Sequence, residues 1–235
     1  MAGETVKCEA VCLSVRPWSQ TSHVVAWLTP HGRVVTAVKG AVRPKSAFLG
    51  QYDLNYTCEI VYYAGSRGDV HALRECTPLA MRESLREDFR ALALAGYFRS
   101  LAERFAPQGE EAREWLSMLG EALDRLAAGV ADPAAAMAEM LFFDMKTIAM
   151  LGLDPGVESQ SGAFALRGER RIPVSPEVAE LLLSLSRSHV PVATDLQVAL
   201  DAARVIGIYY TIHLELPSEA RRAVLVMATK TVKRG

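Results

Sequence analysis

The chain has 235 residues, half of them hydrophobic and 23% charged, so it can bury a sizeable core and its composition excludes disorder as the main state. Its 26 basic and 27 acidic side chains leave a formal net charge of −1, which excludes a general attraction to nucleic acid or to an anionic membrane. The longest stretch without a charged side chain, residues 17–32, contains two prolines and is shorter than the ~20 apolar residues that span a bilayer. We therefore expect no transmembrane helix.

Two features predict a cytoplasmic protein. The first residues, Met1–Glu9, include two glutamates where a secretory signal would have a basic end and an apolar run. The four cysteines form no C-x-x-C pair, and a tetrahedral zinc site would need paired ligands that their spacing does not offer. We interpret them as small core residues in a reducing compartment. They are Cys8, Cys12, Cys58 and Cys76.

Strand-like segments with turn signals between them fill the first third of the chain. They are Val6–Val15, His23–Thr29, Val34–Lys39, Tyr52–Tyr63 and Val70–Glu75. Gly32 in the second connection, and Gly65 and Gly68 in the fourth, permit the positive φ of tight turns, which predicts two hairpins. Five strands in about 70 residues suit an OB-type Greek-key barrel better than an immunoglobulin-like sandwich.

The fourth of these segments alternates apolar and polar residues. Alternation places successive side chains on opposite faces of a strand, so one face is predicted to lie in the core and the other in solvent. The predicted core face comprises Tyr52, Leu54, Tyr56, Cys58, Ile60 and Tyr62.

From Leu79 onward, apolar residues recur at the spacing of helices. This spacing predicts a long amphipathic helix over residues 85–105 and a second over residues 110–126. Further helix starts are indicated at Asp132-Pro133, at Ser175-Pro176, at Thr194–Gln197, which matches a capping box, and at Ser218. We expect these helices to form a bundle.

The predicted fold is therefore α+β: a five-stranded OB-fold β-barrel in residues 1–78, followed by an all-α helical domain in residues 79–235. A change in composition near Thr77-Pro78 sets this boundary. Within the helical domain, residues 156–174 form a short connection that contains glycine and serine. In it, Ala163–Leu166 and Arg171–Val174 would form a hairpin around residues 167–169.

Charge is unevenly distributed, with net values of +2 for residues 1–80, −5 for residues 81–155 and +2 for residues 156–235. The stretch from Lys39 to Ser46 holds two lysines and Arg43 without an acidic side chain. Gly40 lets the backbone approach a ligand closely, and these cations suit sequence-independent contact with phosphates. A solvated loop that is kept soluble by its charge explains the same residues equally well.

Two further features allow more than one interpretation. Lys230, Lys233 and Arg234 would extend a basic track, although a frayed cationic tail explains them more simply. Trp18 and Tyr63 stay open as stacking platforms for unpaired bases, which on OB barrels contribute ~1–3 kcal/mol per base.

The sequence contains no pattern typical of catalysis. Its five histidines are dispersed and match neither H-E-x-x-H nor another metal-ligand spacing. It also lacks a Walker-type phosphate loop, a G-x-G-x-x-G fingerprint and a G-x-S-x-G elbow. We expect a protein that is not an enzyme and that needs no metal or cofactor.

Several motifs occur in the order seen in a known family. Val38–Ala41 and Lys45-Ser46 resemble its barrel, Leu85–Asp88 resembles its first long helix, and Leu151–Pro155 matches its Leu-Gly-x-x-Pro signature. By these residues the chain resembles the RecO family of bacterial recombination mediators over most of its length.

The resemblance implies an OB barrel followed by a helical domain, and a function other than chemistry. Members bind single- and double-stranded DNA, anneal complementary strands, and assist loading of RecA onto DNA coated with single-stranded-DNA-binding protein. The implied partners are RecR and the C-terminal tail of that binding protein, and the implied location is cytoplasmic, at the nucleoid. Carried over by position, the leading phosphate contacts are Lys39, Arg43 and Lys45, followed by Arg33 and Arg16.

The sequence departs from the family pattern in two places. Many members carry a four-cysteine zinc module after the Leu-Gly-x-x-Pro helix, whereas residues 156–174 contain no cysteine. Leu141 and Phe142 occupy the place where some members have basic residues that hold the acidic tail of the binding protein. Lys146, Arg204 or Arg221 would have to substitute for them.

Two other functions stay open beside DNA binding. The chain could be an adaptor whose barrel and helices contact only other proteins. It could also, more remotely, be a hydrolase whose motif is not recognised.

Overall fold

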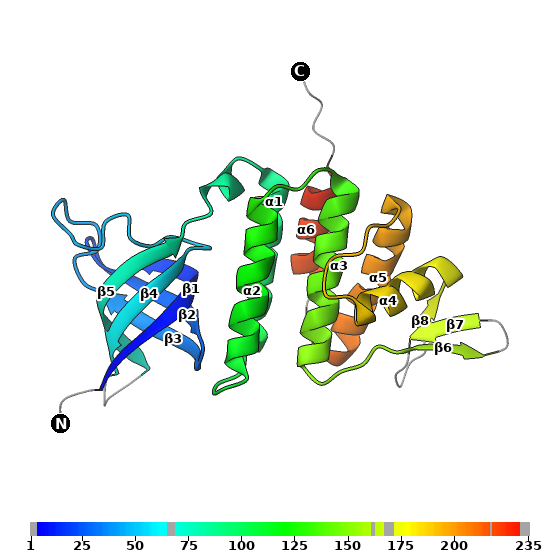
Figure 1. The fold of residues 1–235 in the computed structure, drawn as a ribbon, viewed down its shortest axis with the longest axis horizontal. Helices are drawn as coiled ribbons and strands as arrows, with labels where there is room; N and C mark the ends of the chain where they lie inside the picture. Colours follow the sequence, from blue (N-terminus) through cyan, green and yellow to red (C-terminus); the bar gives the residue numbers. More distant parts are fainter. Residues whose placement is uncertain (1–3, 65–68, 161–162, 167–171, 217, 231–235) are drawn as a thin grey trace, which may run out of the picture. The chain divides into compact units, whose positions relative to one another are not determined.

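The computed structural model describes residues 4–64, 69–160, 163–166, 172–216 and 218–230 (Figure 1). The chain divides into two compact units. The first unit comprises residues 1–84 and 98–127, and the second comprises residues 85–97 and 128–235. The domain boundary predicted at residue 78 stays a prediction. The strand that contains this residue continues to Ala80.

Five strands of the first unit form a closed barrel (Figure 1). They are β1 (Thr5–Pro17), β2 (His23–Thr29), β3 (Gly32–Val38), β4 (Thr57–Tyr63) and β5 (Val70–Ala80). The order around the barrel is β1-β2-β3-β5-β4, and β4 pairs with β1 to close it. The β3–β5 pair is parallel, with Val35 opposite Val70, and the other pairs are antiparallel. This five-stranded Greek-key arrangement confirms the predicted OB fold.

The fourth strand begins five residues later than predicted, because the backbone turns before it. Asn55 has a φ of 69°, which an extended strand does not permit, and the Tyr56 amide donates to the Asp53 carbonyl (3.1 Å). The prediction that Leu54 faces the core is therefore wrong, since 39% of this residue is exposed. Tyr56 and Tyr62 are buried as predicted, and Tyr52 packs at the edge of the core.

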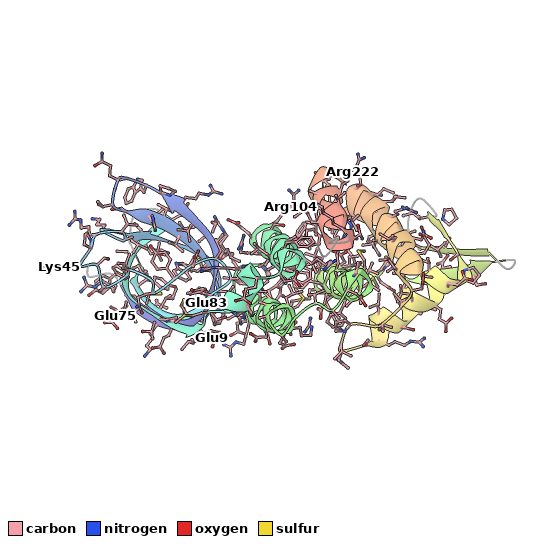
Figure 2. All side chains as sticks on the ribbon, turned by 90° about the horizontal axis from the view of Figure 1, so that it is seen from above. Glu9, Lys45, Glu75, Glu83, Arg104 and Arg222 are labelled. Carbon is pink, nitrogen blue, oxygen red and sulfur yellow. The ribbon has the colours of Figure 1, made fainter. Side chains whose placement is uncertain are left out.

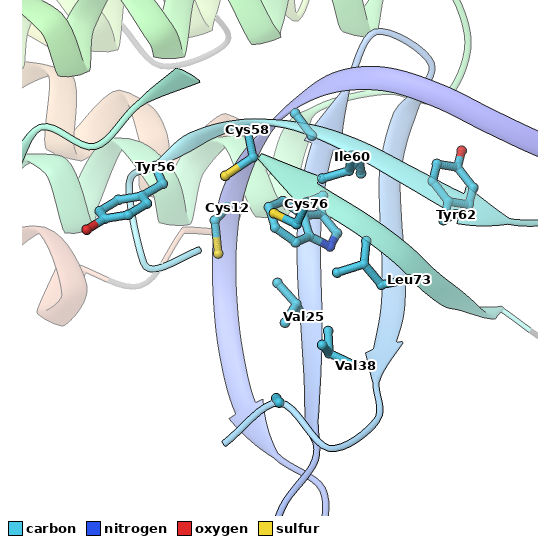
Figure 3. Close-up of a cluster of buried hydrophobic side chains, with 12 residues drawn as sticks. Cys12, Val25, Val38, Tyr56, Cys58, Ile60, Tyr62, Leu73 and Cys76 are labelled. Atoms are coloured by element: carbon cyan, nitrogen blue, oxygen red, sulfur yellow. The ribbon is translucent and has the colours of Figure 1, made fainter. Parts of the chain in front are cut away.

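The barrel core combines aliphatic, aromatic and thiol side chains (Figure 3). The Trp27 indole is fully buried, and its Nε1–H donates to Thr36 Oγ1 (2.8 Å), so its polar atom is satisfied. Cys12, Cys58 and Cys76 are buried free thiols and Cys8 is partly buried, which confirms their prediction as core residues.

Helical segments follow the barrel strands. α2 (Ala112–Ala127) belongs to the first unit and packs against β1 and β2. The 3₁₀ turn η1 (Glu83–Arg86), which follows β5, is divided between the two units. α1 (Phe89–Phe105) contributes its last residues, from Phe98 onward, to this unit and its first turns to the second unit. Both long predicted helices are present.

The second unit is a bundle around α3 (Pro133–Met150), which contacts each of the other three long helices. These are α4 (Pro176–Arg187), α5 (Leu196–His213) and α6 (Ser218–Thr229). Asp132 Oδ1 accepts from the Ala135 amide (2.8 Å), and Ser175 Oγ accepts from the Val178 amide (3.3 Å), as the start signals predicted.

The cap of α5 differs from the predicted capping box. Asp195, one residue after Thr194, is the N-cap, and its carboxylate accepts from the Gln197 amide (2.7 Å). The Gln197 side chain turns forward to Asp201 (3.2 Å) instead of back to the cap. An aspartate is as good a cap as threonine and is charged, which favours it at the positive end of the helix.

The helical domain also holds a small antiparallel sheet. Its strands are β6 (Val157–Gln160), β7 (Ala163–Leu166) and β8 (Ile172–Val174). The pairing of β7 with β8 confirms the predicted hairpin, whose turn at residues 167–169 lies outside the described residues. β6 was not predicted, since a four-residue segment with a single apolar residue carries little strand signal.

Among the described residues, no helix is both long enough and apolar enough to cross a bilayer.

Candidate nucleic-acid interface

Two loops meet at one end of the barrel, because of how the strands pair. Pro17, the last residue of β1, lies opposite His23, and His23 lies opposite Val38, the last residue of β3. The β1–β2 loop (residues 18–22) and the β3–β4 loop (residues 39–56) therefore emerge side by side. We call this part of the barrel the loop end.

The β3–β4 loop is anchored to the barrel rather than extended into solvent. Ala41 is buried in the core, and Phe48 and Tyr52 pack against it. The Tyr52 hydroxyl lies 2.8 Å from His23 Nδ1. Hydrogen bonds close successive backbone turns of this loop. The Arg43 amide donates to the Gly40 carbonyl (3.2 Å), and the Ser46 amide donates to the Arg43 carbonyl (2.9 Å).

The two loops are joined by hydrogen bonds that define a hollow between them. The Val42 amide donates to the Thr21 carbonyl (3.3 Å), and the Gly40 amide donates to Ser22 Oγ (3.2 Å). The hollow has a volume of ≈ 460 Å³. It is lined by Trp18, Ser19, Ser22, Lys39, Gly40 and Arg43.

Four of the five predicted phosphate contacts lie at the loop end. Lys39 and Arg43 line the hollow, and Lys45 follows on the same loop, where its side chain projects from the barrel (Figure 2). Arg16 is exposed near the end of β1, where it pairs with Val24 of β2. We call Arg16, Lys39, Arg43 and Lys45 the basic cluster.

The structure does not bring Arg33 to the basic cluster. Arg33 is the second residue of β3 and Lys39 follows its end, and six residues of strand span roughly 20 Å. Its guanidinium pairs with Glu103 Oε1 (3.4 Å) on α1. In the second unit, Lys230 is exposed, and Lys233 and Arg234 lie outside the described residues.

Charge is separated on the barrel. Across the described part of the chain, no acidic side chain forms an ion pair with any member of the basic cluster. Acidic residues instead lie on the strands β1, β4 and β5, where Glu9 is directly opposite Glu59. Figure 2 shows Glu9 of β1 and Glu75 of β5. Lys7 Nζ offsets this repulsion in part, 2.8 Å from Glu59 Oε1, and the pairing raises the pKa of Lys7. Because these strands also carry Lys7 and Arg74, their net charge is small, and a polyanion would be attracted to the loop end in preference to them.

Trp18 is the residue of this site that sequence reasoning left unassigned. Its side chain is 60% exposed, and it stands beside Lys39 and Arg43 at the hollow. The sequence shows only a tryptophan in an uncharged turn between two strands, and this pattern does not indicate which residues lie beside it in space. Tyr63, the other open aromatic residue, has the Arg74 guanidinium carbon 4.8 Å from its ring centre.

The barrel thiols do not form a reactive or metal-binding centre. Cys58 and Cys76 both donate weakly to the Gln51 carbonyl (3.6 and 3.5 Å), and burial raises the pKa of Cys12. A thiol kept neutral in this way is a poor nucleophile and a poor ligand. Over the residues that the structure describes, no three side chains of His, Cys, Asp or Glu are grouped to hold a metal ion.

Comparisons with known proteins agree with this architecture. The family model described as Recombination protein O N terminal matches residues 1–82, and the model described as Recombination protein O C terminal matches residues 86–222. A DNA repair protein RecO from Geobacter metallireducens is 26% identical over 152 residues, which cover 63% of this chain and 59% of the relative. A second DNA repair protein RecO, from Desulforudis audaxviator, is 27% identical over 158 residues, which cover 67% of this chain and 61% of the relative.

The matched region therefore spans about three fifths of the length of each of these relatives. The two family models, by contrast, leave only short parts of the sequence unmatched, and their border between residues 82 and 86 follows the end of β5. The chain belongs to the recombination protein O (RecO) family.

Proposed function

We propose that this chain is a DNA-binding recombination mediator that holds DNA at the loop end of its barrel. The observation that carries this proposal is the basic cluster beside Trp18, which is exposed and has no acidic partner among the described residues. The relatives are named DNA repair proteins, in agreement with a role in recombinational repair.

The chemistry of the basic cluster fits contact with the DNA backbone. Lys39, Arg43 and Lys45 present their charges on an anchored loop, so little backbone entropy is lost when phosphates bind. Backbone contacts of this kind carry no sequence information. They suit a protein that must act on any sequence.

Backbone binding also supports annealing. Cations that neutralise phosphates reduce the repulsion between two strands, while base edges that are not read remain available for pairing. We propose that the chain anneals complementary single strands in this way. By the same contacts it would assist loading of RecA onto DNA coated with single-stranded-DNA-binding protein, together with RecR.

The second unit offers a place for the acidic tail of the single-stranded-DNA-binding protein. A hollow of ≈ 310 Å³ lies between α5 and α6, with Ala203, Gly207 and Leu225 among its apolar walls and Arg204 and Arg222 beside them. Arg221 is not available for this role, because it is buried against Asp144. Lys146 lies over the Phe142 ring (5.4 Å) and is not part of this hollow. We propose that the tail binds here, through Arg222 and through Arg204, whose guanidinium also pairs with Asp201 on the same helix.

A salt titration of oligonucleotide binding tests the proposal. The logarithm of affinity should fall linearly with the logarithm of salt concentration, with a slope of about −0.7 for each single-strand phosphate that is neutralised. The double variant Lys39→Ala/Arg43→Ala should give a shallower slope by about one to two units. The matched control Lys7→Ala/Arg33→Ala removes the same charge elsewhere on the barrel and should leave the slope unchanged.

Two results would contradict the proposal. An unchanged slope in Lys39→Ala/Arg43→Ala would remove the basic cluster from DNA binding. Absence of salt-dependent binding by the unmodified protein would favour the adaptor, whose apolar contacts with other proteins depend far less on salt.

A further inference from the structure

We infer that the hollow beside Trp18 seats one unpaired nucleobase, so that the loop end distinguishes single-stranded from duplex DNA. This inference rests on the proposed function, because the basic cluster would hold the phosphates on either side of that base. Contacts with phosphates do not depend on the base, so the inference adds a separate site for the base itself.

The backbone that carries the Trp18 indole is held in place, and the indole itself is exposed. The Trp18 amide donates to the Ser22 carbonyl (2.9 Å), and the Ser19 amide donates to the same carbonyl (3.3 Å), which closes the β1–β2 loop. The backbone is thus fixed while 60% of the residue stays exposed. The other two tryptophans, Trp27 and Trp115, are 0% and 1% exposed. An anchored, open aromatic face beside cations is what a stacking platform requires.

Arg43 provides a second planar group at the hollow. Gly40 has a φ of 67°, and a Cβ at this position would lie only 3.2 Å from Arg43 Cδ and 3.4 Å from Arg43 Nε. The absence of a side chain at Gly40 therefore lets Arg43 lie back across the loop. Guanidinium groups, like indoles, stack on the faces of splayed-out bases.

A polar group completes the site. Ser22 Oγ accepts from the Gly40 amide (3.2 Å), so its own hydroxyl proton can be donated to an acceptor on a base edge. Every base carries acceptors, and every base has a π-face, so the seat would accept any of the four. This tolerance agrees with a protein that does not read sequence.

Duplex DNA cannot use this seat without unpairing. The faces of its bases are covered by their neighbours, whereas its phosphates still reach Lys39 and Lys45. Single strands would gain the stacking contribution and duplexes would not. Stacking of one base contributes ~1–3 kcal/mol, and 1.4 kcal/mol is a factor of ten, so the expected preference is about tenfold.

The test compares Trp18→Ala and Trp18→Phe with the unmodified protein. Each is titrated with an oligothymidylate, with an abasic strand of the same number of phosphates, and with a duplex. We expect Trp18→Ala to weaken oligothymidylate binding about tenfold. Binding of the abasic strand and of the duplex should change less than twofold, and Trp18→Phe should retain most of the affinity.

Tryptophan fluorescence gives an independent readout. Because Trp27 and Trp115 are buried, quenching by oligothymidylate should come from Trp18 and should disappear in Trp18→Phe. Equal loss of abasic and oligothymidylate binding in Trp18→Ala, or quenching that persists in Trp18→Phe, would overturn the inference. If Lys39→Ala/Arg43→Ala still reduces the salt slope in that case, the proposed function stands and only the base seat falls.

Discussion

The guanidinium of Arg221 on α6 forms an ion pair with the carboxylate of Asp144 in the middle of α3, and the two residues are 3% and 0% exposed. Tyr97 joins them, since its hydroxyl donates to Asp144 Oδ1 and accepts from Arg221 Nη1, each at 2.8 Å. Tyr210 on α5 donates to the Asp144 carbonyl (3.1 Å). One buried polar network thus connects α3, α5 and α6 with the part of α1 that belongs to the second unit.

Removing one partner of this pair should destabilise the second unit strongly. Burial raises the pKa of Asp144, whereas Arg221 and the tyrosine hydroxyls favour its charged form. Asp144→Ala leaves the Arg221 guanidinium buried without its counter-charge, which costs about 3–5 kcal/mol. Urea unfolding followed by far-UV circular dichroism measures this loss.

The control for that prediction replaces both charges. Asp144→Leu/Arg221→Met should lose far less stability than the sum of the two single variants, because no charge is then stranded in the interior. A loss below about 1 kcal/mol in Asp144→Ala would mean that water reaches the pair, and would contradict its burial.

Arg82 should stabilise the first unit. Its guanidinium donates to the Asn55 carbonyl (2.9 Å), to Thr57 Oγ1 (2.8 Å) and to Asp124 Oδ1 (2.6 Å), and its side chain is almost fully buried. Arg82→Met leaves these acceptors without their donor and should cost about 1–3 kcal/mol. Tryptophan fluorescence during urea unfolding reports on this unit, which contains all three tryptophans.

An exposed arginine of α2 serves as the comparison for Arg82. Arg113→Met removes the same charge from the surface of the same unit and should change stability by less than about 0.5 kcal/mol. Equal losses in Arg82→Met and Arg113→Met would refute the role of the buried guanidinium.

Alanine substitutions at two glycines of the β3–β4 loop distinguish the effect of backbone strain from the effect of moving Arg43. Gly40 and Gly50 have φ values of 67° and 75°, so alanine is strained at both, by about 1 kcal/mol. Only at Gly40 would the new Cβ meet Arg43, since nothing lies within 4 Å at Gly50. We expect Gly40→Ala to weaken oligonucleotide binding several-fold and Gly50→Ala to leave it unchanged, at similar cost in thermal stability. Equal affinities would show that the position of Arg43 does not matter.

Local sequence signals predicted what depends on neighbours along the chain. Turn signals between short strand-like segments predicted the barrel strands, and Asp132 and Ser175 predicted two helix starts, because turns and caps are decided within a few residues. The late start of β4 was missed because Asn55 adopts a positive φ, which residues other than glycine adopt only occasionally and which the alternating pattern does not reveal. The cations of the β3–β4 loop could be predicted, but their meeting with Trp18 could not, because it depends on the pairing of Pro17 with His23 and of His23 with Val38. The Asp144–Arg221 pair left no signal, since the two residues are 77 positions apart.

The barrel thiols should make the first unit less stable at alkaline pH. Burial raises the pKa of Cys12, so this thiol stays protonated in the folded state when the unfolded thiol ionises, above about pH 8.5. The unfolded state then binds fewer protons, and the free energy of unfolding falls as pH rises, by up to about 1.4 kcal/mol per pH unit for such a thiol. Urea unfolding between pH 8 and pH 10, with reductant present, should show this decline. Cys12→Ala lowers stability at pH 8 through lost packing, but its decline with pH should be shallower, and parallel declines would contradict a protonated Cys12 in the core.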